Sequence, residues 1–156
     1  MTYWAITAIL SLMTPEAQAL LLKAATVATR AHAGHKRKDG SPYIAHPMRV
    51  AFRVSEQGVY AQIVALLHDV VEDTDVTLDD LTELGFPEPI RDAVDRVTKR
   101  PGETYRDFID RARQHDISRV VKIADIEDNL ADQSALDPEE ADFLRKRYTK
   151  ALEKLR

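Results

Sequence analysis

Cysteine is absent from this 156-residue sequence, and glycine and aromatic residues are scarce, at five glycines and 6% Phe, Trp and Tyr together. The absence of cysteine excludes disulfide bonds and thiolate-bound zinc. It is typical of proteins of the reducing cytoplasm, where we expect this chain to act. Any metal site must therefore use histidine, aspartate and glutamate side chains.

Long hydrophobic runs and an excess of basic residues are also missing. The apolar segment Met1–Met13 is too short to cross a bilayer and lacks the positively charged start of a signal peptide. We expect it to form a first helix that packs on the core or on a partner subunit of a homo-oligomer, with no membrane contact. The 22 Lys and Arg against 26 Asp and Glu give a net charge of −4, which argues against a nucleic-acid partner.

Apolar residues at helical spacing dominate the rest of the chain. The first such segment begins at Thr14-Pro15 and the last at Asp137-Pro138, both with a capping side chain before a proline. No segment alternates with the period of a strand, and no repeat or linker interrupts the pattern. The sequence therefore predicts a single all-α domain over residues 1–156, a compact bundle of about seven or eight helices.

The apolar helix predicted over Val59–Val71 ends in a cluster of polar residues. His68 and Asp69 are adjacent there, and Glu72 and Asp73 follow within five positions. Ionised carboxylates are almost never buried unless they are paired or bind a metal. We interpret His68 and Asp69 as ligands of a divalent metal ion, with the two acids that follow handling a water molecule. A core histidine beside a surface acid is the alternative interpretation of such a pair.

Further ligands must come from other helices. His32 lies on the inward apolar face of the helix predicted to begin at Thr14-Pro15. Asp125 follows a mostly apolar segment, Val120–Ala124, like the one before His68. Two imidazoles and two carboxylates suit Mn²⁺, Fe²⁺ or Zn²⁺ and leave positions for water and substrate. A hydrogen-bonded core histidine and a helix-surface acid are the alternatives for His32 and Asp125.

The order of these residues resembles the H…HD…D pattern of the HD phosphohydrolase superfamily. More narrowly, the chain resembles the hydrolase domain of RelA/SpoT-type proteins and the stand-alone small alarmone hydrolases. The run from His68 to Thr74 is the most specific part of the match. The other matching segments are Ala31–Gly34, Arg37–Lys38, Gly40–Pro47, Val50–Ala51, Thr77–Leu78, Val97–Thr98 and Val121–Asp125, with Gly85 and Asn129.

The resemblance implies a fold, a cofactor and a reaction. It implies an all-α HD-domain bundle with Mn²⁺ held by four ligands: His32, His68, Asp69 and Asp125. Glu72 and Asp73 correspond to the acidic pair that orients or deprotonates the attacking water. The implied reaction removes the 3′-pyrophosphate of (p)ppGpp, or of a related alarmone such as ppApp, and gives GDP or GTP from the guanosine forms.

Substrate contacts are expected at four positions. Arg37 and Lys38 belong to the densest basic run of the chain and suit phosphate groups. The resemblance places Asn129 against the nucleoside and Tyr148, on the last helix, near the nucleotide. A solvated loop, a surface amide and a packed tyrosine are the corresponding structural alternatives. We expect His46 to hold the loop beside the metal without binding it.

The identity of the substrate stays open. Near Asp125 the family usually has basic residues where this chain has Ile126 and Ala131. The basic run Arg145–Arg147 on the last predicted helix is an alternative source of positive charge for binding the nucleotide. One alternative is an HD phosphohydrolase that acts on another nucleotide or phosphoester. The other is a catalytically inactive nucleotide-binding regulatory domain, against which an intact acidic pair beside the metal argues.

Overall fold

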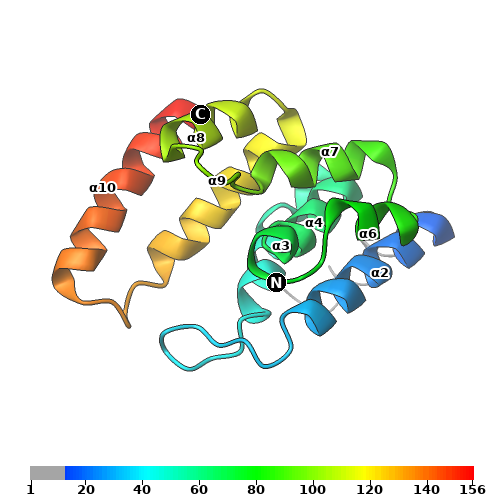
Figure 1. Cartoon of the computed structure of the whole chain (residues 1–156), viewed down its shortest axis with the longest axis horizontal. Coiled ribbons are helices and arrows are strands. Elements are labelled where there is room, and N and C mark those ends of the chain that lie inside the picture. The colour runs from blue at the N-terminus through cyan, green and yellow to red at the C-terminus, as the bar shows by residue number, and fades with distance from the viewer. Residues whose placement is uncertain (1–12) are drawn as a thin grey trace.

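The computed structural model describes residues 13–156, and all regular structure in this range is helical (Figure 1). Over these residues eight helices have six residues or more: α2 (Pro15–Ala31), α3 (Ala45–Arg53), α4 (Val59–Leu67), α6 (Leu78–Glu83), α7 (Glu88–Val97), α8 (Tyr105–Arg113), α9 (Asp116–Ala131) and α10 (Pro138–Leu155). Shorter pieces are α5 (Val70–Asp73) and the 3₁₀ turn η1 (Ser55–Gln57). The predicted all-α bundle is confirmed.

The predicted N-terminal helix, apart from Met13, lies outside the described residues. Helix boundaries further along follow local capping chemistry. Thr14, Thr77 and Asp137 each accept a hydrogen bond from a backbone N–H of the first turn of the helix that follows. Past the end of α2, Gly34 has φ +81°, a left-handed conformation that favours glycine and prevents the helix from continuing. None of the described helices is both long and apolar enough to span a bilayer.

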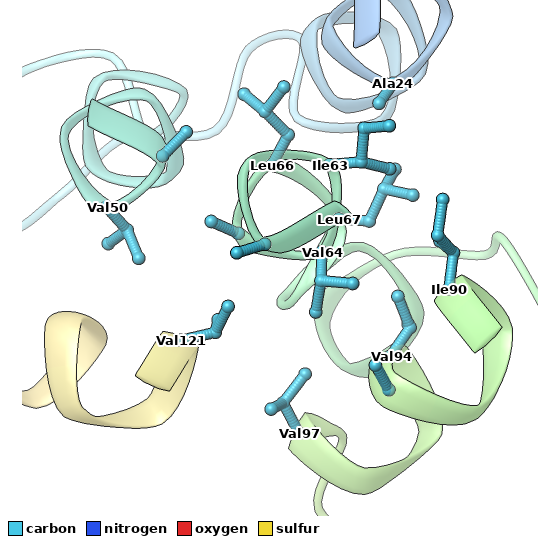
Figure 2. Close-up of a cluster of buried hydrophobic side chains, with 14 of the residues drawn as sticks. Ala24, Val50, Ile63, Val64, Leu66, Leu67, Ile90, Val94, Val97 and Val121 are labelled. Atoms are coloured by element: carbon cyan, nitrogen blue, oxygen red, sulfur yellow. The ribbon is translucent and has the colours of Figure 1, made fainter. Parts of the chain in front are cut away.

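Helix α4 is the centre of the main hydrophobic core. Figure 2 shows its side chains surrounded by residues of four other helices: Ala24 of α2, Val50 of α3, Val121 of α9, and Ile90, Val94 and Val97 of α7. All of its residues from Ile63 to Leu67 are buried. A helix that is apolar on all sides is stable only in such an interior position. Any residue at its C-terminal end is therefore held inside the molecule.

A second, smaller cluster joins α8, α9 and α10. Its buried members are Ile109, Ile126, Ala151, Leu152 and Leu155. In Figure 1, α10 lies beside α8 and α9, on the opposite side of the molecule from α2. Helix α9 contributes to both clusters and connects them.

The prediction of one continuous helix over Val59–Val71 is wrong. Helix α4 ends at Leu67 and α5 begins only at Val70, so His68 and Asp69 form a break between them. The ring nitrogen Nδ1 of His68 lies 2.7 Å from the carbonyl oxygen of Ala65, which fixes the ring against the last turn of α4. Apolar periodicity continues through Val70 and Val71 and therefore does not reveal the break.

The loop between α7 and α8 is anchored by one arginine. The guanidinium of Arg111 donates to the carbonyl oxygens of Asp95 and Thr98 at 2.7 and 2.8 Å. It also donates to both carboxylate oxygens of Glu103, each at 2.8 Å. The two side chains are only 14% and 12% exposed, so this ion pair is shielded from solvent.

We expect Glu103→Gln to remove an acid-sensitive part of the stability. Hydrogen bonds from Arg111 lower the pKa of Glu103 from 4.5 to about 2. A lowered carboxyl pKa stabilises the fold fully above the unfolded-state pKa, and this contribution is lost as pH falls from about 4.5 towards 2. In urea unfolding, the variant should lose roughly 1.5 to 3 kcal/mol at pH 7 and much less at pH 3. An equal loss at both pH values, or an equal loss in the exposed control Glu83→Gln, would contradict the assignment.

Candidate active site

The break after α4 brings two adjacent side chains to one point. In a continuous helix, neighbouring residues point about 100° apart. Here Nε2 of His68 lies 3.0 Å from Oδ2 of Asp69. His68 is buried and Asp69 is 17% exposed, so the pair lies at the boundary between the core and a cleft.

Two further elements contribute groups to the same point. His46, in the first turn of α3, places Nε2 at 3.6 Å from Oδ2 of Asp69 and 3.1 Å from Oδ1 of Asp125. Asp125, on α9, also lies 3.6 Å from Nε2 of His68. The four groups come from α3, from the junction of α4 and α5, and from α9. His46, His68 and Asp125 are buried and Asp69 is partly buried, although Asp125 lies more than 50 positions after the other three.

These donors fit a divalent metal ion. Ligand atoms at about 2.0 to 2.2 Å from one ion lie at most about 4.4 Å from each other. The closest approaches within the group are 3.0 to 3.6 Å. The ligand atoms of His46, His68 and Asp69 all lie within 4.8 Å of one another. Nε2 of His68 is buried and has no hydrogen-bond partner of good geometry, as expected for an atom that binds a metal.

His32 lies next to this group but not within it. It is 2% exposed at the C-terminal end of α2, and its ring centroid is 4.8 Å from that of Tyr43. Both of its ring nitrogens are buried without a hydrogen-bond partner. Burial lowers the pKa of His32, while the charge of Asp69 opposes the shift. A neutral imidazole with free nitrogens is the form that binds metals.

His46 has a larger role than the sequence indicates. Its Nδ1 lies 2.8 Å from Oδ2 of Asp128, while Arg49 donates to the other carboxylate oxygen of Asp128 at 3.0 Å. Asp128 is 1% exposed, so this carboxylate fixes the orientation of the His46 ring. This role of Asp128 was not predicted from the sequence. Its position three residues after Asp125 on the same helix face is the signal that could have identified it.

Burial and charge act in opposite directions on the central groups. Burial alone would lower the pKa of His68, but Asp69 and Asp125 raise it well above its ordinary value. Burial would raise the pKa of Asp125, but Lys122 lowers it. The ammonium of Lys122 lies 2.7 Å from Oδ2 of Asp125 and 4.6 Å from the centroid of the Phe108 ring. In the site, the negative charges of Asp69 and Asp125 are therefore offset by the positive charge of Lys122 and by His68 in its protonated form.

The predicted acidic pair lies beside the metal-ligand group. The backbone N–H of Lys99 donates to Oε2 of Glu72 at 2.8 Å, so the loop anchored by Arg111 fixes this carboxylate. The hydroxyl of Tyr43 donates to Asp69 at 2.7 Å and to Asp73 at 3.2 Å. Burial, together with the charges of Asp69 and Glu72, raises the pKa of Asp73. A raised pKa makes this carboxylate a better proton acceptor near neutral pH.

The site opens into two adjoining cavities. An inner cleft of about 240 Å³ contains Asp69, Asp125 and the acidic pair. An outer cavity of about 340 Å³ lies between the loop after α2 and helix α10. Tyr43, Asn129 and Tyr148 line both, so the two spaces adjoin. The amide of Asn129 donates to Oδ1 of Asp125 at 2.7 Å.

Arg37 and Lys38 face the outer cavity and not the inner cleft. Nε of Arg37 lies 3.1 Å from Oδ2 of Asp132, and Lys38 pairs with Glu140 of α10. Both predicted phosphate contacts are thus already paired with acids. A phosphate group that binds them has to displace a carboxylate.

Comparison with known proteins identifies a family and relatives for this chain. The HD domain family matches residues 24–146. The human guanosine-3′,5′-bis(diphosphate) 3′-pyrophosphohydrolase MESH1 is 40% identical over 132 residues, which cover 78% of this chain and 73% of the human protein. A probable GTP pyrophosphokinase of Mycobacterium leprae is 37% identical over 131 residues, 77% of this chain. The match covers only 16% of the length of that mycobacterial protein.

A solved structure supports the same placement. It was reported with the words "A metazoan ortholog of SpoT hydrolyzes ppGpp and plays a role in starvation responses" and superposes with a TM-score of 0.76. The sequence identity is 26%, and the match covers 88% of this chain and 86% of the solved one. The family match over most of the chain and the similarity to MESH1 show that the protein belongs to the HD-domain family, in the group of the MESH1 and SpoT-like proteins.

Proposed function

We propose that this protein is a metal-dependent phosphohydrolase that removes the 3′-pyrophosphate of (p)ppGpp or of a related alarmone such as ppApp. The observation that carries the proposal is the convergence of Asp69 and Asp125 in one cleft with Glu72 and Asp73, with the buried His68 against both aspartates. The activities named for the human and metazoan relatives support it.

Mn²⁺ is the proposed ion, and Fe²⁺ and Zn²⁺ suit the same nitrogen and oxygen donors. The proposed ligands are His32, His68, Asp69 and Asp125. The unpartnered nitrogens of His32 and His68 support this set. When bound, the ion supplies positive charge that makes a water molecule more acidic and offsets the charge of the phosphoryl group.

The acidic pair performs the proton chemistry in this proposal. Glu72, whose Oε2 accepts from the Lys99 N–H, orients the attacking water with its second oxygen. Asp73 has a raised pKa and accepts the proton as the water attacks the phosphorus bonded to the 3′-oxygen. The bond between that phosphorus and the 3′-oxygen breaks, pyrophosphate leaves, and the 3′-oxygen takes up a proton to become the hydroxyl of the nucleotide product. The Tyr43 hydroxyl, which bridges Asp69 and Asp73, keeps the two carboxylates in a fixed relation.

The two cavities suggest how a nucleotide lies in the site. The 3′-pyrophosphate occupies the inner cleft, where the acids lie, and the nucleoside occupies the outer cavity. Asn129 and Tyr148 line the passage between them and contact the nucleoside. Arg37 and Lys38 then contact the 5′-phosphates at the outer end. We propose that this small nucleotide is the substrate, and that the protein acts in the cytoplasm with neither nucleic acid nor membrane involved.

One incubation panel tests the function. Purified protein with Mn²⁺ is given ppGpp, ppApp, GTP, a dNTP mixture or a generic phosphoester, and the products are separated by ion-exchange chromatography. We expect pyrophosphate and GDP from ppGpp, with no product in the presence of excess EDTA. Inorganic phosphate from another substrate would instead identify a different HD phosphohydrolase. Tight nucleotide binding without turnover would identify a regulatory domain.

A further inference from the structure

Arg147 is a cationic side chain in the inner cleft that has no acidic partner. It lies on α10 and lines the same 240 Å³ cleft as Asp69 and Glu72. Within residues 13–156 it makes no salt bridge and no hydrogen bond, and its Nε is buried without a partner. A buried donor without a partner is unfavourable, so an unpaired guanidinium in a cleft calls for a functional explanation.

The orientation of Arg147 is fixed without the use of its donors. The central carbon of its guanidinium lies 3.7 Å from the centroid of the Tyr105 ring, at the start of α8. Stacking on an aromatic face leaves the N–H groups in the guanidinium plane free to donate to a ligand. The Tyr105 hydroxyl is likewise buried without a hydrogen-bond partner. Two donors therefore lie side by side in the wall of the cleft.

Three other cations near the site are already paired with acids. Lys122 pairs with Asp125, Arg37 with Asp132, and Lys38 with Glu140. To bind an anion, each of them would have to give up a carboxylate. Arg147 can bind an anion without losing an ion pair, because its guanidinium packs on an uncharged ring.

We propose that Arg147 is a substrate-binding residue that holds the pyrophosphate group in the inner cleft, with Tyr105 as its platform. The inference rests on the proposed function and names a residue beyond those predicted from the sequence. A planar guanidinium donates two parallel hydrogen bonds to a phosphate group, which suits a dianionic or more highly charged ligand. Glu72 and Asp73 line the same cleft, so the phosphorus that water attacks belongs to the group that Arg147 holds.

The same helix supplies a matched control. Arg145 precedes Arg147 by two residues and is exposed, whereas Arg147 is half-buried in the cleft wall. Residues two apart on a helix point about 200° from each other. Arg145→Gln therefore removes the same charge from the opposite face of α10 without altering the cleft.

The test measures pyrophosphate binding and turnover separately. Calorimetry with inorganic pyrophosphate, in constant excess Mn²⁺, gives Kd for wild type, Arg147→Gln, Arg147→Lys and Arg145→Gln. Kinetics with ppGpp give kcat and KM for the same proteins. We expect Arg147→Gln to raise the Kd for pyrophosphate and to lower kcat/KM for ppGpp, each by roughly 10- to 100-fold. Arg147→Lys should recover part of both losses, and Arg145→Gln should stay within about threefold of wild type.

Each outcome decides the inference. If Arg147→Gln binds pyrophosphate as wild type does, or if Arg145→Gln is equally impaired, the assignment is overturned. Should Arg147→Gln fail to fold, as judged by circular dichroism, a folded Arg147→Lys with unchanged Kd and kcat/KM would overturn it as well. If no alarmone is hydrolysed by wild type but pyrophosphate binding still depends on Arg147, the proposed function fails and this inference stands.

Discussion

Replacing Asp69 with alanine should abolish hydrolysis and greatly weaken Mn²⁺ binding. Oδ2 of this carboxylate lies 3.0 Å from His68, 3.6 Å from His46, and 2.7 Å from the Tyr43 hydroxyl that donates to it. Within residues 13–156 no other side chain has a polar contact with all three, so no described neighbour can substitute for it. We expect a loss of kcat/KM of at least a thousandfold, beyond the roughly 10- to 100-fold typical of groups that only support a ligand. Hydrolysis assays and calorimetric titration with Mn²⁺ measure the two effects.

Two controls accompany this substitution. Asp79→Ala removes an exposed acid from the first turn of α6 and should leave both measurements unchanged. Asp69→Asn keeps the shape of the side chain and tests whether the charge or the packing matters. Retention of Mn²⁺ affinity within threefold of wild type in a folded Asp69→Ala protein would show that Asp69 is not a metal ligand.

Replacing Glu72 should separate turnover from metal binding. Glu72→Gln keeps an oxygen that accepts from the Lys99 N–H, so the α7–α8 loop should stay in place. It removes the negative charge that orients and polarises the attacking water. We expect kcat to fall by roughly 10²- to 10⁴-fold, the range for loss of a general acid–base group, with Mn²⁺ affinity preserved. Steady-state kinetics and the same metal titration provide the comparison.

Asp73→Asn is the informative companion variant. If Asp73 accepts the proton and Glu72 only orients the water, both variants lose turnover, and the double variant loses little more than the worse single one. Full activity in Glu72→Gln would show that its assignment is wrong. The exposed control Glu83→Gln should behave as wild type.

The helices could be predicted from sequence because their signals are local. Thr14-Pro15 and Asp137-Pro138 begin α2 and α10 as expected, since capping side chains and prolines act within one turn. The break between α4 and α5 could not be predicted, because the apolar pattern continues across it. That residues 1–156 form one domain stays a prediction, which the HD family match over residues 24–146 supports.

The site was only partly predictable, because only some of its residues carry a local sequence signal. His68 and Asp69 could be identified because polar residues at the end of an apolar helix conflict with simple burial, and Asp125 follows a similar approach. The structure brings these three together and adds His46, while His32 lies beside them.

Arg147 and Asp128 depend on long-range contacts. The sequence singles out the basic run that contains Arg147 but not which of its residues enters the cleft. That depends on how α10 packs against Tyr105, 42 positions earlier in the chain. Likewise, the spacing of Asp128 from Asp125 indicates a shared helix face but not that Asp128 meets His46, which lies 82 positions earlier. Contacts between residues so far apart in the chain cannot be predicted from a local sequence pattern.

The two hydrophobic clusters support different parts of the proposed site. The proposed ligands at the end of α2 and at the α4–α5 junction belong to helices packed around α4, whereas Tyr148 and Arg147 extend from α10, which packs in the other cluster. On the roles proposed for Tyr148 and Arg147, amino-acid changes along α10 would alter which molecule is accepted while the proposed metal-ligand group keeps its shape.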